Sequence, residues 1–342
     1  MVDQPAFAGF SGWIIRVGQK QAMATPKATV VITTYNRAAT LRDRSVASVR
    51  KQTYQDWECI VVDDGSSDDT EAVMQSLIKE DPRIRYFKKE NDGMSAERNF
   101  GVRQSRGEYI AFLDDDDEFL PNYLERLMDT FETLSPEYAC IAPVSIVRDY
   151  QGRETEVYNE LEPFWKYSIG SCCCFKRAVF FDHDVFFDEK LQSFEDDDFH
   201  IQFHFSGQKL YRLWEPLVIC TIGLKRKSGN SVSANHSRQR RCFDDFLKKN
   251  GRIYEEQGKE AVAWLYSFGG WLYLADGKMK EGRRMLWTSF RAQPTVLPAV
   301  YILASFFGPR FFAVFLNFKT SAMRFLRVHL LVDRAPKEPK LQ

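Results

Sequence analysis

Apolar and polar residues follow one another along the chain in short blocks that predict strands and helices in turn. A continuous run of mainly β-branched residues at 29–34 predicts a strand that is buried on both faces. Leu41, Val46 and Val49 then recur at roughly helical spacing, and a second apolar run at 57–62 predicts the next strand. Strand, helix and strand in this order indicate a βαβ unit, which is the building block of parallel sheets.

The alternation continues beyond this unit. Helices are predicted at 71–79 and 94–104, and strands at 84–87, 109–113 and 139–147. This order is typical of the α/β class, with a doubly wound, mostly parallel sheet flanked by helices. From residue 238 the pattern is mostly helical, so we expect a C-terminal helical extension of the sheet domain.

Three segments are therefore expected along the 342 residues. Residues 1–27 lack the features of a secretory signal and are expected to form a loose leader, with Met23 as an alternative start. Residues 28–235 are expected to form the α/β domain, and residues 236–342 the helical extension. Because 44% of the side chains are hydrophobic and 27% are charged, the chain can bury a sizeable core.

The charges of the chain cancel in total but are unevenly distributed. The 47 basic and 47 acidic residues give no net charge, which argues against a nucleic-acid partner. Residues 257–342 contain 13 Lys and Arg against 5 Asp and Glu, so this end carries +8 and the rest carries −8. Seven cysteines, three of them consecutive, fit a reducing compartment, and no Cys or His spacing predicts a zinc site.

Polar side chains directly follow three of the predicted strands. These polar clusters lie at 33–36, 63–66 and 114–117. In doubly wound sheets the ligand binds outside the carboxyl ends of the strands. We therefore expect the three clusters to converge on one rim of the sheet and to form the ligand site there.

The four aspartates at 114–117 are open to two interpretations. A run of carboxylates is most often a solvated loop, but this one leaves a buried strand directly. Four like charges repel one another unless a cation neutralises them, and hard oxygen ligands select Mg²⁺ or Mn²⁺. An EF-hand is excluded, because Phe119 stands where its loop needs glycine. A metal held by one or two carboxylates keeps positions open for phosphate oxygens, which indicates a nucleotide.

Two further acidic clusters also allow a structural and a functional interpretation. The 63–66 cluster is either an ordinary turn or the source of a carboxylate that accepts hydrogen bonds from a base or ribose. Residues 195–198 either favour the dipole at the start of a helix or contain a general base. Both interpretations of residues 195–198 can hold together, because a base at a helix start is rigidly placed.

Five motifs in a fixed order suggest a family. They are Val-Val-Ile-Thr-Thr-Tyr-Asn-Arg (30–37), Val-Val-Asp-Asp-Gly-Ser-Ser-Asp-Asp-Thr (61–70), Asn-Asp-Gly-Met-Ser-Ala-Glu-Arg-Asn-Phe-Gly (91–101), Gly-Glu-Tyr-Ile-Ala-Phe-Leu-Asp-Asp-Asp-Asp (107–117) and Phe-Glu-Asp-Asp-Asp-Phe (194–199). Over about residues 28–235 the chain thereby resembles the family-2 glycosyltransferases of GT-A fold, of the bacterial surface-polysaccharide type. The resemblance implies a nucleotide-sugar donor such as a UDP-sugar, a divalent metal ion and inversion at the anomeric carbon.

The resemblance also assigns residues to the donor. It implies that Thr33, Tyr35 and Asp64 line the nucleoside pocket and that Arg98 lies near the nucleotide. It places Asp115 close to the sugar or the ribose. These five residues form the expected nucleotide site.

The remaining assignments concern the metal and the proton. Asp114 and Asp116 match the first and third positions of the Asp-x-Asp motif, and Asp116 is the more direct metal ligand. Asp196 matches the general base, although an error of one position in this alignment would give that role to Asp197. Both roles also follow from the chemistry, since a leaving diphosphate needs a Lewis acid and the acceptor hydroxyl needs a base on the opposite face of the sugar.

One segment departs from the family pattern. Residues 226–233 resemble an Arg-x-His-x-x-Ser-x-Ser segment that closes over the diphosphate, but Ser228 stands in place of the histidine. A histidine ligand of the metal is therefore absent from that position. Arg226 and Lys227 could still neutralise phosphate charge, and His236 is a weaker candidate ligand.

The C-terminal part combines apolar and basic residues. Residues 292–318 contain a single charge, Arg310, and Pro294, Pro298 and Pro309 interrupt them. A membrane-spanning helix needs about 20 consecutive apolar residues. We therefore favour peripheral attachment to an anionic membrane surface over packing in a core or homo-oligomer interface, and over a span.

Together these features predict a hexosyl- or N-acetylhexosaminyl-transferase of polysaccharide biosynthesis. The acceptor would be a glycan or a lipid-linked glycan at the inner face of the cytoplasmic membrane. Two alternatives stay open. A sugar nucleotidyltransferase would release pyrophosphate rather than a nucleoside diphosphate, and a catalytically silent module would bind the donor without turnover.

Overall fold

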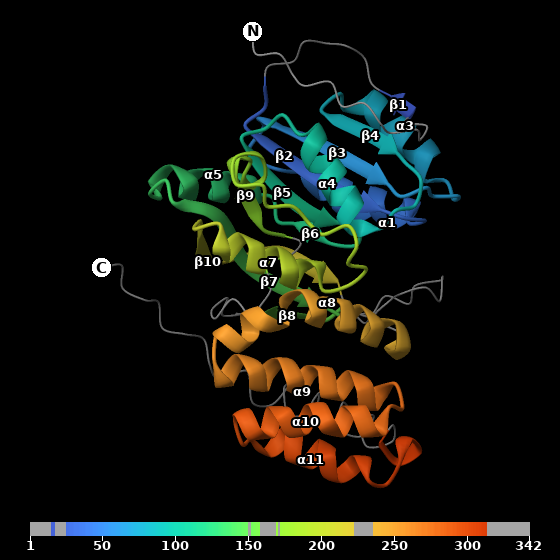
Figure 1. The fold of residues 1–342 in the computed structure, drawn as a ribbon. Helices are drawn as coiled ribbons and strands as arrows, with labels where there is room; N and C mark the ends of the chain where they lie inside the picture. Colours follow the sequence, from blue (N-terminus) through green and yellow to red (C-terminus); the bar gives the residue numbers. More distant parts are fainter. Residues whose placement is uncertain are drawn as a thin grey trace. The chain divides into compact units, whose positions relative to one another are not determined.

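The chain forms two structural units, one built on a sheet and one on helices (Figure 1). The computed structural model describes residues 15–17, 25–149, 152–157, 169, 172–221 and 235–312. The first unit comprises residues 1–159 and 169–224, and the second comprises residues 160–168 and 225–342. The prediction of an α/β fold with C-terminal helices is confirmed.

The first unit contains a mixed sheet of ten strands. The strands are β1 (Ile15–Val17), β2 (Ala28–Thr34), β3 (Trp57–Asp63), β4 (Ile84–Lys88), β5 (Tyr109–Asp114), β6 (Glu118–Phe119), β7 (Tyr138–Arg148), β8 (Glu154–Val157), β9 (Cys174–Lys176) and β10 (Lys209–Thr221). Their order is β1-β4-β3-β2-β5-β9-β7-β10-β6, and β8 pairs with β7. Strands β4, β3, β2 and β5 run parallel, as the βαβ pattern predicted.

The helices of this unit connect the parallel strands or follow them. They are α1 (Ala38–Thr40), the π-helix η1 (Leu41–Val46), α2 (Ala47–Arg50), α3 (Thr70–Glu80), α4 (Met94–Gln104), α5 (Tyr123–Thr133), α6 (Ala178–Phe181) and α7 (Glu195–Phe205). The three apolar residues that predicted the first helix, Leu41, Val46 and Val49, are fully buried. The predicted helices and strands up to β7 agree with the observed ones to within about one residue.

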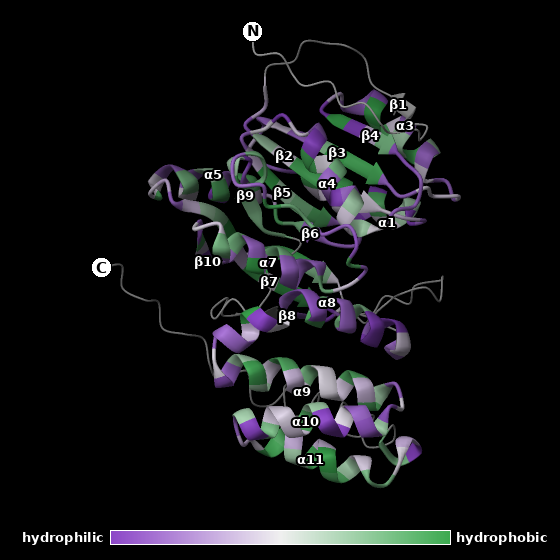
Figure 2. Cartoon of the chain, in the orientation of Figure 1, coloured by the Kyte–Doolittle hydropathy of each residue, from purple (hydrophilic) through white to green (hydrophobic). Residues whose placement is uncertain are grey.

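Burial and register place the ends of the strands together. All seven residues of β2 and all seven of β3 are buried, as a sheet covered on both faces requires (Figure 2). Thr33 of β2 pairs with Asp114 of β5, and Thr34 pairs with Asp63 of β3. The three polar clusters therefore meet at one rim, as predicted.

The second unit consists of helices in the part of the chain that the structure describes. They are α8 (His236–Glu256), α9 (Lys259–Ala275), α10 (Met279–Ala292) and α11 (Val296–Ser305). Leu274, Leu286, Tyr301 and Phe312 are buried in a shared core of α9, α10, α11 and the residues that follow. Within the described ranges, no helix combines the length and the hydropathy that crossing a membrane would require.

Candidate active site

The end of β2 contributes both a buried and an exposed side chain to the rim. Thr33 is buried beside β5, whereas 44% of Tyr35 is exposed just beyond the strand. Asn36 follows with a left-handed backbone (φ 54°), a conformation that asparagine tolerates better than most residues. Its side-chain oxygen accepts a hydrogen bond from the Ser67 N–H at 2.8 Å, which ties the end of β2 to the loop after β3.

The two aspartates after β3 hold local backbone in place. Asp63 accepts hydrogen bonds from the Tyr86 hydroxyl and from the Ser66 N–H, so it stabilises its own turn. The carboxylate of Asp64 accepts the N–H groups of Asp92 and Gly93, at 2.9 and 3.1 Å. Burial raises the pKa of Asp64, and these two hydrogen bonds oppose the rise. Asp64 thus positions the loop in front of α4.

Arg98 joins residues from three parts of the chain. It lies on α4, and only 2% of its side chain is exposed. Its guanidinium donates to Asp196 of α7 at 2.7 Å and to Asp114 of β5 at 3.3 Å, and it lies 4.0 Å from Glu195. The proposed base and the first aspartate of the tetrad are therefore neighbours, joined by one buried cation.

The start of α7 presents Asp196 in a constrained position. Phe194, which precedes the helix, has a left-handed backbone with φ 66°, a costly conformation for a bulky residue that is often found near functional sites. Desolvation raises the pKa of Asp196 to about 6, while Arg98 lowers it. Desolvation also raises the pKa of Asp197, to about 7. A carboxylate with a pKa near 6 is mostly ionised at neutral pH and can accept a proton.

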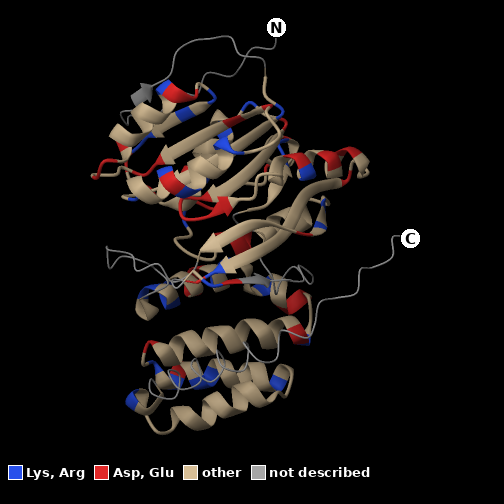
Figure 3. Cartoon of the chain, turned by 180° about the vertical axis from the view of Figure 1, so that it is seen from behind, with Lys and Arg blue, Asp and Glu red and all other residues tan. Residues whose placement is uncertain are grey.

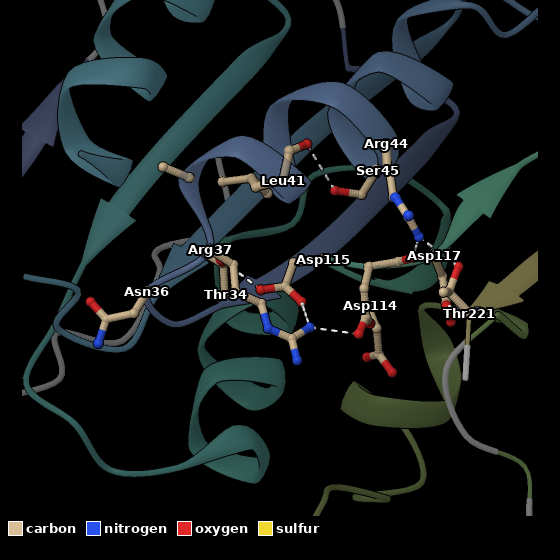
Figure 4. A network of polar contacts seen from close by, with 12 residues as sticks. Thr34, Asn36, Arg37, Leu41, Arg44, Ser45, Asp114, Asp115, Asp117 and Thr221 are labelled. Atoms are coloured by element: carbon tan, nitrogen blue, oxygen red, sulfur yellow. Dashed lines mark hydrogen bonds and ion pairs between the residues drawn. The ribbon is translucent and has the colours of Figure 1, made fainter. Parts of the chain in front are cut away.

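A second arginine binds the middle of the tetrad (Figure 4). Arg37 Nη1 lies 2.7 Å from Asp115 Oδ1 and 2.6 Å from Asp116 Oδ2. Asp115 also accepts a hydrogen bond from the Thr34 hydroxyl at 2.8 Å. Burial raises the pKa of Asp115 to about 6, although Arg37 opposes the rise. Arg37 thus supplies positive charge to the two aspartates that the resemblance assigns to the sugar and the metal.

The last aspartate of the tetrad has a different hydrogen-bond partner. Asp117 accepts a hydrogen bond from the Thr221 N–H at 2.8 Å, and burial raises its pKa to about 9. Arg44 donates to the Thr221 hydroxyl at 2.8 Å and approaches the carbonyl oxygen of Asp116 at 3.3 Å (Figure 4). The resemblance gave no role to Asp117.

A divalent metal ion is compatible with this donor set. Asp114 and Asp116 offer carboxylate oxygens whose side chains are 31% and 19% exposed at the rim. Such hard oxygens suit Mg²⁺ or Mn²⁺, and partial exposure leaves room for phosphate ligands. An ion at Asp116 would compete with Arg37 for the same carboxylate.

Sequence reasoning missed the two charged partners Arg37 and Arg44. Arg37 stood within a quoted motif, but its pairing with Asp115 and Asp116 depends on tertiary geometry. The basic segment at 226–233, with Ser228, lies outside the described residues. His236 begins α8 in the second unit, where its ring lies 5.9 Å from that of Trp271.

Comparisons with known proteins relate the chain to glycosyltransferases. Residues 29–188 match the model of the family "Glycosyl transferase family 2". A Campylobacter jejuni GalNAc(5)-diNAcBac-PP-undecaprenol beta-1,3-glucosyltransferase is 45% identical over 105 residues, which are 30% of this chain and 34% of that protein. The match thus spans only about a third of that relative. The putative glycosyltransferase EpsH of Bacillus subtilis is 26% identical over 77% of this chain and 81% of its own length.

Solved structures show the same fold at low sequence identity. TarS 1-349 of S. aureus, in complex with UDP-GlcNAc, is 17% identical and has a TM-score of 0.54 over 78% of this chain and 82% of its own. The mannosyltransferase PcManGT from Pyrobaculum calidifontis, in complex with GDP-Man and Mn2+, is 15% identical and has a TM-score of 0.52 over 84% of this chain and 82% of its own. At these identities the likeness concerns the fold.

Proposed function

We propose that the chain, whose residues 29–188 match the model of glycosyl transferase family 2, is a member of that family and transfers a sugar from a nucleotide-sugar donor to a hydroxyl acceptor, with inversion. The observation that supports the proposal most is the contact of Arg98 with both Asp114 and Asp196. Through this contact Asp114, a carboxylate of the proposed donor site, lies near Asp196, a carboxylate that can act as a base. Residues 28–235 would hold this chemistry.

The two halves of the reaction use different carboxylates. Asp196 would take the proton of the acceptor hydroxyl as the hydroxyl attacks the anomeric carbon, on the face opposite the leaving nucleotide. A divalent ion held by Asp116, with Asp114 beside it, would supply Lewis-acid stabilisation of the leaving diphosphate. Arg98 would fix the position of Asp196 and favour its ionised form, since its guanidinium stabilises the charged carboxylate.

We assign the donor to UDP-sugars, of the hexose or N-acetylhexosamine class. The support is indirect: the TarS structure contains UDP-GlcNAc, and the Campylobacter relative is a glucosyltransferase. Thr33, Tyr35 and Asp64 would contact the nucleoside, and Asp115 the sugar or ribose. Arg98 would act near the nucleotide as a positioning residue, because its guanidinium is already bound by carboxylates.

We assign the acceptor to lipid-linked glycans of polysaccharide biosynthesis, met at the inner face of the cytoplasmic membrane. The printed name of the Campylobacter relative includes a PP-undecaprenol group. In the second unit, α11 offers a surface for such a membrane. Val296, Val300 and Leu303 recur at helical spacing on α11 and are 36–80% exposed, and Phe307, which follows the helix, is 72% exposed.

Charge next to this apolar face favours an anionic lipid surface as its partner. The guanidinium of Arg283 lies 4.8 Å from the ring of Phe306, and that of Arg291 lies 5.6 Å from the ring of Trp287. Phe306 and Trp287 are themselves 69% and 48% exposed. Basic groups beside exposed aromatic rings are typical of helices that lie in a membrane interface. Figure 3 shows the Lys and Arg residues of the chain in blue.

Vesicle binding tests the membrane assignment. We expect the full chain to sediment with anionic vesicles but not with neutral ones, and high salt should weaken binding because each basic residue contributes about 1 kcal/mol. Leu303→Glu and Phe307→Glu should abolish sedimentation, whereas Phe205→Glu, at a 57% exposed position of the first unit, should not. Sedimentation that survives both α11 substitutions, or a dimer that they dissociate, would contradict the assignment.

A donor screen tests the transferase activity. The full chain is incubated with Mn²⁺, individual nucleotide sugars and a polyprenyl-diphosphate glycan, and both nucleoside diphosphate and glycosylated lipid are measured. We expect one UDP-sugar to give both products, with Asp196→Asn as the inactive control. Pyrophosphate formed from a nucleoside triphosphate and a sugar phosphate would instead identify a nucleotidyltransferase, and donor binding without turnover would identify a silent module.

A further inference from the structure

Asp117, the last aspartate of the tetrad, and two cysteines form a cluster of metal-binding side chains that plays no part in the proposed transfer. Asp117, Cys172 and Cys220 place one oxygen and two sulfur atoms within 4.8 Å of one another. The two sulfur atoms are 3.7 Å apart, and the Cys172 sulfur lies 3.8 Å from Asp117 Oδ2. Asp117 and Cys172 are buried, and Cys220 is partly buried.

The surrounding backbone holds these side chains in place. Asp117 Oδ1 accepts a hydrogen bond from the Thr221 N–H, and Asp117 Oδ2 is the oxygen that lies near the Cys172 sulfur. Cys172 has a left-handed backbone with φ 80°, an uncommon conformation for cysteine. Its N–H donates to the Phe112 carbonyl at 2.8 Å, and its carbonyl accepts from the Tyr123 hydroxyl at 3.0 Å. Cys172 is therefore fixed at both ends of its backbone.

The distances match those between ligands of a tetrahedral zinc ion. With Zn–S near 2.3 Å and Zn–O near 2.1 Å, two sulfur ligands lie about 3.8 Å apart, and a sulfur and an oxygen ligand about 3.6 Å apart. The observed 3.7 and 3.8 Å lie close to both values. We propose that Asp117, Cys172 and Cys220 bind a thiophilic divalent cation of the zinc class, with water at the fourth position. This site goes beyond the proposed transferase function.

The ligand types separate this site from the one at Asp116. Thiolates select zinc-like ions, whereas carboxylates alone suit Mg²⁺ or Mn²⁺. Since Asp117 follows β5, Cys172 precedes β9 and Cys220 lies on β10, a bound ion would tie together three segments next to the tetrad.

Cobalt substitution tests the site directly. The full chain is purified with a non-thiol reductant, stripped with a chelator and titrated with Co²⁺, whose thiolate complexes absorb in the near ultraviolet. We expect about one Co²⁺ per chain, displaced by Zn²⁺. Loss of a residue that only supports a metal ligand typically lowers metal affinity by roughly 10–100-fold. Cys172→Ser and Cys220→Ser remove ligands themselves, so each should lower the affinity for Co²⁺ by more than that. Cys173→Ser and Cys242→Ser, which alter buried thiols outside the cluster, should bind as the wild type does.

Two results would overturn the proposal. One is the wrong absorption of the Co²⁺ complex: either the wild-type chain shows no thiolate band in the near ultraviolet, or the band persists when Cys172 and Cys220 are both replaced. The other is a Cys172–Cys220 disulfide in the chain purified under the same reducing conditions. Thermal melting of each variant separates loss of the site from loss of the fold, and Asp117→Asn, which keeps the side-chain shape, gives a second ligand variant. Mn²⁺-dependent UDP binding on the same samples reports separately on the proposed function.

Discussion

Two arginines form ion pairs with the first three aspartates of the tetrad, and these arginines differ in burial. Arg98 is 2% exposed and joins Asp114 to Asp196, which lies 98 positions after Arg98 in the sequence. Arg37 is 19% exposed and bridges the neighbours Asp115 and Asp116. Buried charge is stable only when it is paired, whereas a pair near the surface contributes little and exchanges partners readily. Arg98 is thus a fixed part of the site, and Arg37 occupies a place that a metal ion can take.

Removing the buried arginine should have the largest effect. Arg98→Ala leaves Asp114, Glu195 and Asp196 without their shared cation, and breaking such a pair typically costs about 3–5 kcal/mol of unfolding free energy. We expect urea denaturation to show a loss of this size, together with loss of transfer. Arg98→Lys keeps the charge and should lose less. A loss below about 1 kcal/mol in Arg98→Ala would show that the pair is not structural.

Removing the base should abolish transfer without affecting the donor. Asp196→Asn keeps the shape of the side chain but cannot accept a proton, so we expect the rate of transfer to fall by about 10²–10⁴-fold. UDP affinity should not change. Asp197→Asn is the matched control, because Asp197 lies in the same first turn of α7. If Asp197→Asn were inactive and Asp196→Asn active, the base would be the neighbouring residue.

The pH dependence should distinguish the two carboxylates that titrate near 6. Asp196 must be ionised to act as a base, and its pKa is raised to about 6, so the rate of transfer should rise with pH up to about 6 and then level off. Below that pH the rate should fall about tenfold per unit. The pKa of Asp115 is also raised to about 6, but its protonation should alter UDP binding instead. Measuring both quantities across pH 4.5–8 separates them, and a rate independent of pH in this range contradicts the role of Asp196.

Removing the more exposed arginine should have the smallest effect, and in the opposite direction. Arg37→Gln eliminates a cation that competes for Asp116, so a lower concentration of Mn²⁺ should suffice for half-maximal UDP binding. Arg37 and Asp116 are each 19% exposed, so water partly screens their ion pair, and we expect a shift of up to about fivefold, which corresponds to about 1 kcal/mol. Arg42→Gln, at a half-exposed position of η1, is the control. A weaker response to Mn²⁺ would indicate that Arg37 binds the donor itself.

The sequence predicted the rim of the sheet well, for a physical reason. Parallel strands that begin together also end together, so the polar residues after β2, β3 and β5 had to meet. Thr33 and Asp114 are indeed paired across neighbouring strands. The start of α7 was also predictable, because acidic residues gather at helix N-termini.

The pairings across the site could not be predicted. Nothing in the spacing of Arg98 and Asp196 shows that they meet, and the same holds for Cys172 and Cys220, which are 48 positions apart. Strand β10 was also missed. Its pairing with β7 shifts register around Pro216, which interrupts the regular alternation that strand prediction relies on.

The most direct test of the account is calorimetric titration of UDP into three forms of the chain, with and without Mn²⁺. The wild type should bind UDP only when Mn²⁺ is present, and Asp196→Asn should bind UDP with the same affinity under the same conditions. Asp116→Ala should lose the Mn²⁺-dependent part, because it removes the proposed direct ligand of the ion at the diphosphate. Unchanged, Mn²⁺-dependent affinity in Asp116→Ala would contradict the assignment of the tetrad as the metal site on which the proposed function depends.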